Sequence, residues 1–398
     1  GLASLHNPDK SKESLALHNM ASPKFFIVDG STMEGGGQVL RNSMSLSALL
    51  KIPIRIIKVR AKRDRPGLQP QHLTGINLVS EMYQGSLEGA EVKSGEVSFV
   101  PKAFKAGKFV ADTKTAGSLC LLVQIALPCL VFGAKDGAVT TVRLCGGSNA
   151  SNAPQIDYFQ HVFGPIVRRF GVEYELQLVR RGFYPQGKGL VHFTSRALLS
   201  GQTLLPLVME RQGELKEIVI TALTAGIVNH TEAEDASRTA QEILADRYPG
   251  VAIRVELTKE TRDSAWGNGG AINIFATTTT DCILAGSALG EKGKSGFAMG
   301  TEAANQLIQN IDYGGALDEF AQDQVIIFMA LAAGHSKVRV GPLQLHTETS
   351  IHFAQQMTSA KFTVTAVEPS EYDRPDTEQS YWIECDGIGY NSAAAASS

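Results

Sequence analysis

The sequence predicts a mixed α/β protein, of the α/β or α+β class, in which three tandem βαβαβ-type repeats carry a smaller inserted α/β domain. Helical and strand-like spacings of apolar residues follow one another in the same order three times along the chain. A stretch of different pattern separates the second repeat from the third. Helices that alternate with strands bury their apolar faces in layers, so we expect the repeats to form one pseudo-threefold body. The alternative is chance similarity among short amphipathic segments.

The first two repeats follow each other directly. The first is expected to contain a strand at 25–28, helices over 37–50 and from about residue 71, and strands over 54–59 and 97–100. The second is expected to contain a helix from 115–118 to about Leu130, a strand over 139–144, a helix from about 154–157 and a strand over 173–179. In both repeats a glycine-containing turn opens the first helix.

The third repeat appears only after the insert. It is expected to contain helices over 319–333 and 347–357 and strands over 337–340 and 361–367. The insert is expected to contain strands over 217–222, 252–257 and 271–277, the last continuing toward Leu284, and helices over 232–245 and 300–311.

These patterns divide the chain into a body, an insert and two ends. The body is assigned to 23–204 and 312–390, and the insert, which is long enough for its own core, to 205–311. Residues 1–22 are polar and lack a hydrophobic signal core, so a disordered leader is expected there. The Ala- and Ser-rich end over 391–398 is expected to be a disordered tail.

Composition limits the classes of partner. With 398 residues, 43% of them hydrophobic, the chain can bury a large core. Its net charge of −3 argues against nonspecific coating of nucleic acid, so any such partner is expected at a local basic site. The five cysteines form no CxxC pair, which predicts reduced thiols, no disulfide and no zinc site. The longest apolar run, 119–132, is interrupted by Gln124 and Pro128 and is too short to cross a bilayer. We therefore expect a buried helix and no membrane partner.

Three glycines at 35–37 stand between the first predicted strand and the first predicted helix. Glycine lets backbone amides come close to an anion, and a helix N-terminus adds partial positive charge. The turn therefore suits a phosphate, although a purely structural glycine turn would have the same sequence.

A basic stretch follows over residues 51–65, which hold seven Lys and Arg and one acid. Arg60 and Arg63 lead into a turn, and binding groups often lie at the ends of elements. Their guanidinium groups suit phosphate. Arg55 and Lys58 are interpreted instead as a solvated strand face.

The third repeat holds further reactive side chains. Phe320, Asp323 and Gln324 share one face of an otherwise apolar helix, so the polar pair needs water or a ligand. His346 stands at a strand-to-helix junction in the same repeat. A neutral imidazole, with a reference pKa of about 6.5, can act as a nucleophile toward phosphorus. The alternatives are a solvated helix start and an ordinary surface or core histidine.

Several motifs occur in one order along the chain. They lie at 34–41, 65–73, 113–118, 181–187, 323–324 and around His346. Together they resemble the RNA 3'-terminal phosphate cyclases, from about Phe25 to Gly389. The resemblance implies a body of three repeats like the C-terminal domain of a translation initiation factor, with a thioredoxin-like insert. It also implies ATP-dependent conversion of an RNA 3'-terminal phosphate to a 2',3'-cyclic phosphodiester through covalent histidine-AMP and RNA-adenylate intermediates.

The resemblance also implies a role for each matching residue, with His346 as the catalytic nucleophile. The residues implied to bind ATP are Glu34, Gly35, Gly36, Gly37, Gln38, Phe320, Asp323 and Gln324. Those implied to bind the terminal phosphate and the RNA are Arg41, Arg60, Arg63 and Gln71. The implied metal is Mg²⁺ or Mn²⁺, with Glu34 as its candidate ligand. Guanidinium forks are suited to offset the charge that builds on phosphorus during transfer.

Two positions depart from the family pattern. Phe320 stands where tyrosine is common, which keeps stacking on adenine but removes a hydroxyl contact. Lys188 interrupts the glycine run of the motif at 181–187. Two other functions stay open: a non-catalytic cyclase-like protein of ribosome assembly, which would lack the nucleophilic histidine, and a small-molecule enzyme resembling the enolpyruvyl transferases. The match to eukaryotic members implies the nucleus, with the cytoplasm as the alternative.

Overall fold

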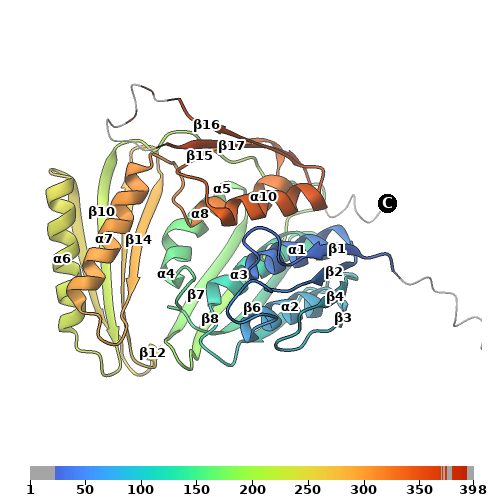
Figure 1. The fold of residues 1–398 in the computed structure, drawn as a ribbon, viewed down its shortest axis with the longest axis horizontal. Helices are drawn as coiled ribbons and strands as arrows, with labels where there is room; N and C mark the ends of the chain where they lie inside the picture. Colours follow the sequence, from blue (N-terminus) through green and yellow to red (C-terminus); the bar gives the residue numbers. More distant parts are fainter. Residues whose placement is uncertain (1–22, 369, 371–372, 374–378, 392–398) are drawn as a thin grey trace, which may run out of the picture.

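The structure, a computed structural model, describes residues 23–368, 370, 373 and 379–391. Helices packed on several sheets confirm the predicted mixed α/β class (Figure 1). The predicted leader over 1–22 and residues 392–398 of the predicted tail lie outside the described residues, so their disorder stays a prediction.

The first sheet is built from the N-terminal repeat. Its elements are β1 (Phe26–Asp29), α1 (Gly37–Leu50), β2 (Ile54–Ile57), α2 (Pro70–Met82), β3 (Ser86–Glu88) and β4 (Val97–Val100). The strand order is β1-β2-β4-β3, with β1 parallel to β2 and β4 antiparallel to its two neighbours. Helix α2 carries Pro70 in its first turn, where the missing amide hydrogen costs no hydrogen bond.

The second sheet is built from the next repeat. Its elements are β5 (Lys108–Asp112), α3 (Leu119–Gly133), β6 (Val139–Gly146), α4 (Ile156–Tyr158), the π-helical segment η1 (Phe159–Phe163), α5 (Gly164–Arg169), β7 (Glu173–Gly182) and β8 (Gly189–Arg196). The order is β12-β7-β8-β6-β5, where β12 (Ala265–Trp266) comes from the insert. Helix α3 is the predicted buried apolar helix. No helix in the described part of the chain is both long and apolar enough to span a bilayer.

The third sheet combines a short early strand with the C-terminal part of the chain. Its elements are β9 (Val208–Met209), α8 (Ala321–Gln324), α9 (Ile326–Leu331), β15 (Ala333–Val340), α10 (Leu345–Met357), β16 (Lys361–Ala366) and β17 (Tyr381–Ile388). The order is β16-β17-β15-β9, with β9 parallel to β15. The three repeats thus share one topology when their strands are counted in chain order. The first strand is parallel to the second, and the fourth lies between the second and the third and is antiparallel to both.

Several details differ from the sequence predictions. The strand predicted over 271–277 and toward Leu284 is two antiparallel strands, Gly269–Thr278 and Ile283–Leu289. Each repeat has a fourth strand beyond the βαβαβ pattern. The insert was predicted to begin at residue 205, but β9 pairs with β15 and belongs to the third sheet, so the insert interrupts the third repeat after its first strand. The helix predicted over 319–333 is two short helices that are separated at Val325, and the second ends at Leu331 because Ala332 adopts an extended conformation and the chain enters β15. An apolar run of this length fits a buried helix or a buried strand equally well.

The insert forms a sheet of its own. Its elements are β10 (Leu215–Ala225), α6 (Thr231–Arg247), β11 (Ala252–Lys259), β13 (Gly269–Thr278), β14 (Ile283–Leu289) and α7 (Gly296–Asp312). The order is β11-β10-β13-β14, and α6 and α7 pack together over one face (Figure 1). A separate apolar core lies beneath these helices.

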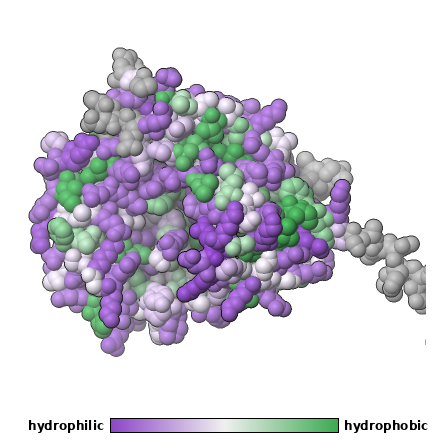
Figure 2. All heavy atoms as spheres, in the orientation of Figure 1, coloured by the Kyte–Doolittle hydropathy of each residue, from purple (hydrophilic) through white to green (hydrophobic). Residues whose placement is uncertain are grey.

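The opposite side of the insert lies against the body. The amide of Asn273 in β13 donates to the side-chain oxygen of Gln155 at 3.2 Å, and the ring of Phe275 lies 4.7 Å from that of His161. The backbone amide of Ala285 donates to the Asp318 carboxylate at 3.1 Å. The face of the molecule in Figure 2 is mostly hydrophilic, with apolar side chains in small separate patches.

Candidate active site

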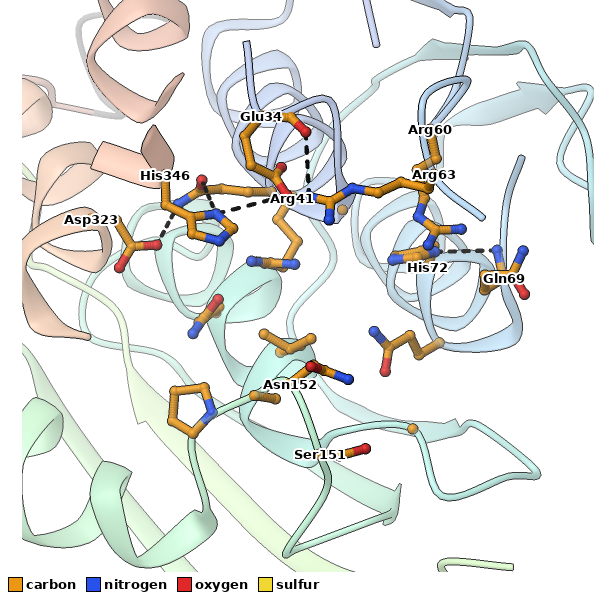
Figure 3. A pocket seen from close by; sticks show the side chains of 18 of the residues that line it. Glu34, Arg41, Arg60, Arg63, Gln69, His72, Ser151, Asn152, Asp323 and His346 are labelled. Carbon is orange, nitrogen blue, oxygen red and sulfur yellow. Dashed lines mark hydrogen bonds and ion pairs between the residues drawn. The ribbon is translucent and has the colours of Figure 1, made fainter. Parts of the chain in front are cut away.

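The three repeats surround a cavity of about 960 Å³ (Figure 3). Of the site residues predicted from the sequence, those that line it are Glu34, Gly37, Gln38, Arg41, Arg60, Arg63, Gln71, Phe320, Asp323, Gln324 and His346. Gly35 and Gly36 form the turn beside it and do not line it. Residues more than 300 positions apart in the chain thus come together, because α1 packs against α10 and the Asn42 amide donates to the Ser350 hydroxyl at 3.0 Å.

His346, in the first turn of α10, ends a short chain of hydrogen bonds. The side-chain amide nitrogen of Gln38 donates to the Asp323 carboxylate, which leaves the amide oxygen of Gln38 facing His346. That oxygen lies 3.2 Å from Nδ1 of His346 and can only accept. Nδ1 therefore carries the proton, and the lone pair lies on Nε2. This is the tautomer that a histidine nucleophile needs.

Burial also favours the neutral imidazole. It lowers the pKa of His346, although the nearby Asp323 carboxylate opposes that shift and Arg41 and Arg63 add to it. Burial raises the pKa of Asp323 to about 6, against the opposing effects of His346 and Arg41. At neutral pH the Asp323 carboxylate is therefore ionised and the nearby His346 ring is uncharged.

Glu34 is held in place by the glycine turn and by one arginine. Its carboxylate accepts a hydrogen bond of 2.6 Å from the Gly36 amide and forms an ion pair with Arg63. It lies 4.0 Å from Nδ1 of His346. A side chain at Gly36 would clash with the Glu34 carboxylate, since its Cβ would lie 2.3 Å from the nearest oxygen. Arg63, to which the family resemblance gives a role in binding RNA phosphate, therefore contacts Glu34, to which it gives a role in binding ATP.

Arg41 has no hydrogen bond or ion pair to any residue that the structure describes. Burial lowers its pKa to about 10, so the guanidinium stays charged. Gly37 allows this close packing: a Cβ at Gly37 would lie 2.5 Å from Nε2 of His72 and 3.3 Å from Nη1 of Arg41. An unpaired cation facing a cavity is a strong site for an anion.

Arg60 and Gln71 line the cavity but also hold its walls together. Arg60 donates to the backbone oxygens of Arg65 and, at 3.1 Å, of Gly67, which fixes the predicted turn. The side-chain oxygen of Gln71 accepts from the Ser118 amide at 3.0 Å and so ties α2 to the start of α3. The basic stretch is thus divided: Arg55 and Lys58 lie outside the cavity with side chains 39% and 60% exposed, which confirms the interpretation as a solvated face, and there they pair with surface carboxylates.

His72 is a site residue that the sequence prediction missed. Its Nδ1 accepts from the Gln69 backbone amide at 3.2 Å, so the proton lies on Nε2, which faces Gly37 beside Arg41. Burial lowers its pKa to about 3, with further contributions from Arg60 and Arg41. It is therefore a neutral donor. Its sequence signals were its place in the motif at 65–73 and at the start of a helix.

The opposite wall is formed by the third repeat and one loop of the second. The ring of Phe320 lies edge-on to Tyr158, with centroids 5.7 Å apart. Gln324 donates to the Phe320 backbone oxygen at 2.6 Å and accepts from the Gln124 amide at 2.9 Å. The loop at 151–154 completes this side and was also missed, because loops have no apolar periodicity.

Comparison with known proteins decides the family. The family model described as RNA 3'-terminal phosphate cyclase matches residues 32–364. The chain belongs to the RNA 3'-terminal phosphate cyclase family. This confirms the resemblance seen in the motifs and the predicted enzyme class.

Similar proteins include RNA 3'-terminal phosphate cyclases from several organisms. A probable RNA 3'-terminal phosphate cyclase of Dictyostelium discoideum is 40% identical over 92% of this chain and 83% of its own length. Those of Drosophila melanogaster and Pyrobaculum aerophilum are 37% and 34% identical, over 93% and 92% of this chain and 99% of their own lengths. The similarity to RNA cyclases covers the body and the insert together.

Proposed function

We propose that this chain uses ATP to convert an RNA 3'-terminal phosphate to a 2',3'-cyclic phosphodiester. The observation that carries the proposal is the chain from Asp323 through Gln38 to His346, which leaves a lone pair on Nε2 in the cavity that also holds the unpaired Arg41. Family membership supports the same reaction.

The reaction has three transfers to phosphorus. Nε2 of His346 attacks the α-phosphorus of ATP, the bond to the bridging oxygen breaks, and pyrophosphate leaves. An oxygen of the RNA 3'-phosphate then attacks the same phosphorus, which forms an RNA-adenylate and regenerates the imidazole. Finally the 2'-oxygen, losing its proton, attacks the terminal phosphorus and releases AMP. The adenylyl group makes a poor leaving group into a good one, so one ATP is used per ring closed.

The cavity residues divide between the two substrates. Phe320 offers an aromatic face for adenine, and Gln324 beside it offers an amide. Arg41 and the Nε2 hydrogen of His72 offer a cation and a donor to the terminal phosphate. Both phosphates would then lie within reach of His346.

We also propose that Mg²⁺ or Mn²⁺ takes part. The described residues contain no group of three or more His, Cys, Asp or Glu side chains able to hold a metal. Mg²⁺ bound to a nucleotide needs only one or two carboxylates, because phosphate oxygens and water supply the rest. Glu34 fits that role as the carboxylate nearest to His346. When bound, the metal would neutralise charge on the phosphates.

A direct test is cyclisation of an RNA that ends in a 3'-phosphate. With ATP and Mg²⁺, the terminal phosphate is expected to become resistant to phosphatase, and the same RNA with a 3'-hydroxyl is expected to stay unchanged. Wild-type protein that neither cyclises RNA nor takes up label from α-labelled ATP would contradict the proposal and favour the non-catalytic alternative. Turnover of a phosphorylated metabolite without a labelled protein would favour the transferase.

The glycine turn gives a prediction with a matched control. Gly37→Ala is expected to lower the rate of RNA cyclisation by at least about tenfold, because its Cβ would displace His72 and Arg41. The initial rate under saturating ATP is the measurement. Gly95→Ala is the control, since no atom lies within 4 Å of its Cβ, and it should behave as wild type. Equal rates in the two variants would contradict the assigned geometry.

The acidity of Asp323 gives a pH dependence. Its pKa of about 6 lies above the ordinary value, so the carboxylate that holds Gln38 is lost as the pH falls below about 6. The lowered pKa of His346 means that the ring itself becomes protonated at a lower pH than an ordinary histidine does. The initial rate of self-adenylylation should therefore be level near neutrality and fall in acid. A rate that rises steeply above pH 7 would contradict this, and Asp323→Asn should lower the rate and remove the step near pH 6.

For location, we propose the nucleus, with the cytoplasm as the alternative. The proposal rests on the similarity to eukaryotic relatives. Immunofluorescence of the untagged protein tests it, and exclusive staining of a membrane-bound organelle other than the nucleus would contradict it.

A further inference from the structure

A second group of side chains lies at the turn between β7 and β8, beside the rim of the cavity. We name it the β7–β8 patch, and it consists of Arg180, Tyr184, Gln186, Lys188 and Trp266. We infer that this patch binds the single-stranded RNA that leads up to the 3' end, by stacking on bases and contacting phosphates. The inference rests on the proposed function, which places the RNA end in the cavity.

The patch presents aromatic rings to solvent. Tyr184 is 81% exposed, and Trp266 is 40% exposed. The indole nitrogen of Trp266 donates to the side-chain oxygen of Gln186 at 3.1 Å, which orients the ring. Rings that are exposed yet held in place are the surfaces on which single-stranded nucleic acids stack, because every base has a π-face.

The same patch carries positive charge. The ammonium of Lys188 lies 4.2 Å from the centre of the Trp266 ring, and the guanidinium of Arg180 lies 5.9 Å from it. The side-chain Nε of Arg180 donates to the Lys188 backbone oxygen at 3.0 Å. Neither cation forms an ion pair with a residue that the structure describes. On a chain with a net charge of −3, two cations without an ion pair beside one exposed ring suit a polyanion.

The patch is continuous with the RNA side of the cavity. The turn packs so closely on Thr115 that a Cβ at Gly187 would lie 2.4 Å from the Thr115 backbone oxygen. Thr115 and Gly117 line the cavity, and Gln71, on the same side, accepts a hydrogen bond from Ser118. A strand with its 3' end beside Arg41 can therefore leave over Thr115 onto the patch.

The backbone conformation of Lys188 guides the choice of a test variant. Its φ of 56° is in the left-handed region, which glycine adopts without strain and lysine does not. It is also the residue that interrupts the glycine run of the motif at 181–187. Its side chain lies over the Trp266 ring, so the ammonium is held at the exposed face of the patch.

The test compares two RNAs that both end in a 3'-phosphate, a dinucleotide and a strand of about twelve nucleotides. The double variant Tyr184→Ala, Trp266→Ala is expected to raise the KM for the longer RNA by about tenfold or more, because two stacking platforms are lost. Self-adenylylation and the KM for the dinucleotide should stay as in wild type. Phe297→Ala, which removes another exposed ring on α7, is the matched control and should change neither KM.

The variant Lys188→Gly distinguishes a loss of RNA binding from a loss of folding stability. It keeps the backbone conformation and removes the ammonium, so the Tm should be unchanged or higher. The salt dependence of binding, measured by anisotropy of a 5'-labelled twelve-nucleotide RNA, should lose about one unit of slope. A purely structural role for the turn predicts no change in that slope.

Defined results would overturn the inference. An unchanged KM for the longer RNA in the double variant would do so, and so would an equal rise for the dinucleotide, which would indicate a disturbed cavity. Variants that bind RNA normally but break up an oligomer of the wild type would make the patch an interface between copies of the chain. If wild-type protein cyclises no RNA, the proposed function fails, while the anisotropy measurement still tests the patch.

Discussion

His346→Ala is expected to abolish transfer of AMP from ATP to the protein, and with it RNA cyclisation, by at least about ten-thousand-fold. The reason is that the hydrogen bonds from Asp323 through Gln38 hold the His346 ring so that the lone pair of its Nε2 can attack phosphorus. The measurement is incorporation of label from α-labelled ATP in the presence of Mg²⁺. The labelled protein should lose its label in acid, as a phosphorus–nitrogen bond does.

His352→Ala is the matched control for this variant. His352 lies on the same helix, but its ring packs edge-on against Phe353 and it does not line the cavity. Its label should equal that of wild type. Label that persists in His346→Ala, or disappears in both variants, would show that the nucleophile was wrongly assigned.

Arg41→Ala is expected to slow the steps that use RNA by about 10²–10³-fold while self-adenylylation changes only a few-fold. The structure gives the reason: Arg41 is a half-buried cation with no hydrogen bond or ion pair to a described residue, on the side of the cavity where His72 also offers a donor. Rates of label uptake and of transfer from preformed protein-AMP to RNA, measured separately, distinguish the two effects.

Two further arginines serve as comparisons. Arg55→Ala is the control, because Arg55 lies outside the cavity beside Glu96 and should leave both rates unchanged. Arg63→Ala is expected to impair both steps, since Arg63 pairs with Glu34. An Arg41→Ala variant that loses both rates to the same extent would contradict the role given to Arg41.

The sequence predicted the elements with strong local signals. Helix α1 begins and ends at the predicted residues, and β4 occupies its predicted range, because a glycine turn and a short apolar run mark their boundaries. The two-residue strand β9 has no such signal, since its pairing with β15 is a tertiary contact. This is why the boundary of the insert was placed too early.

The site was predictable where a motif or a junction pointed to it. Glu34, His346 and Asp323 came from such signals, and the structure brings them together. The state of each group depends on contacts that the sequence does not show. The tautomer of His346 follows from Gln38, and the partner of Arg63 is a carboxylate rather than solvent.

The most direct test of the central claim is a crystal structure of the protein exposed to ATP and Mg²⁺ without RNA. We expect the α-phosphorus to be bonded to Nε2 of His346, while Nδ1 keeps its contact with the oxygen of Gln38. Nucleotide bound in the cavity with its phosphorus on another side chain, or with the His346 ring turned away from it, would contradict the account.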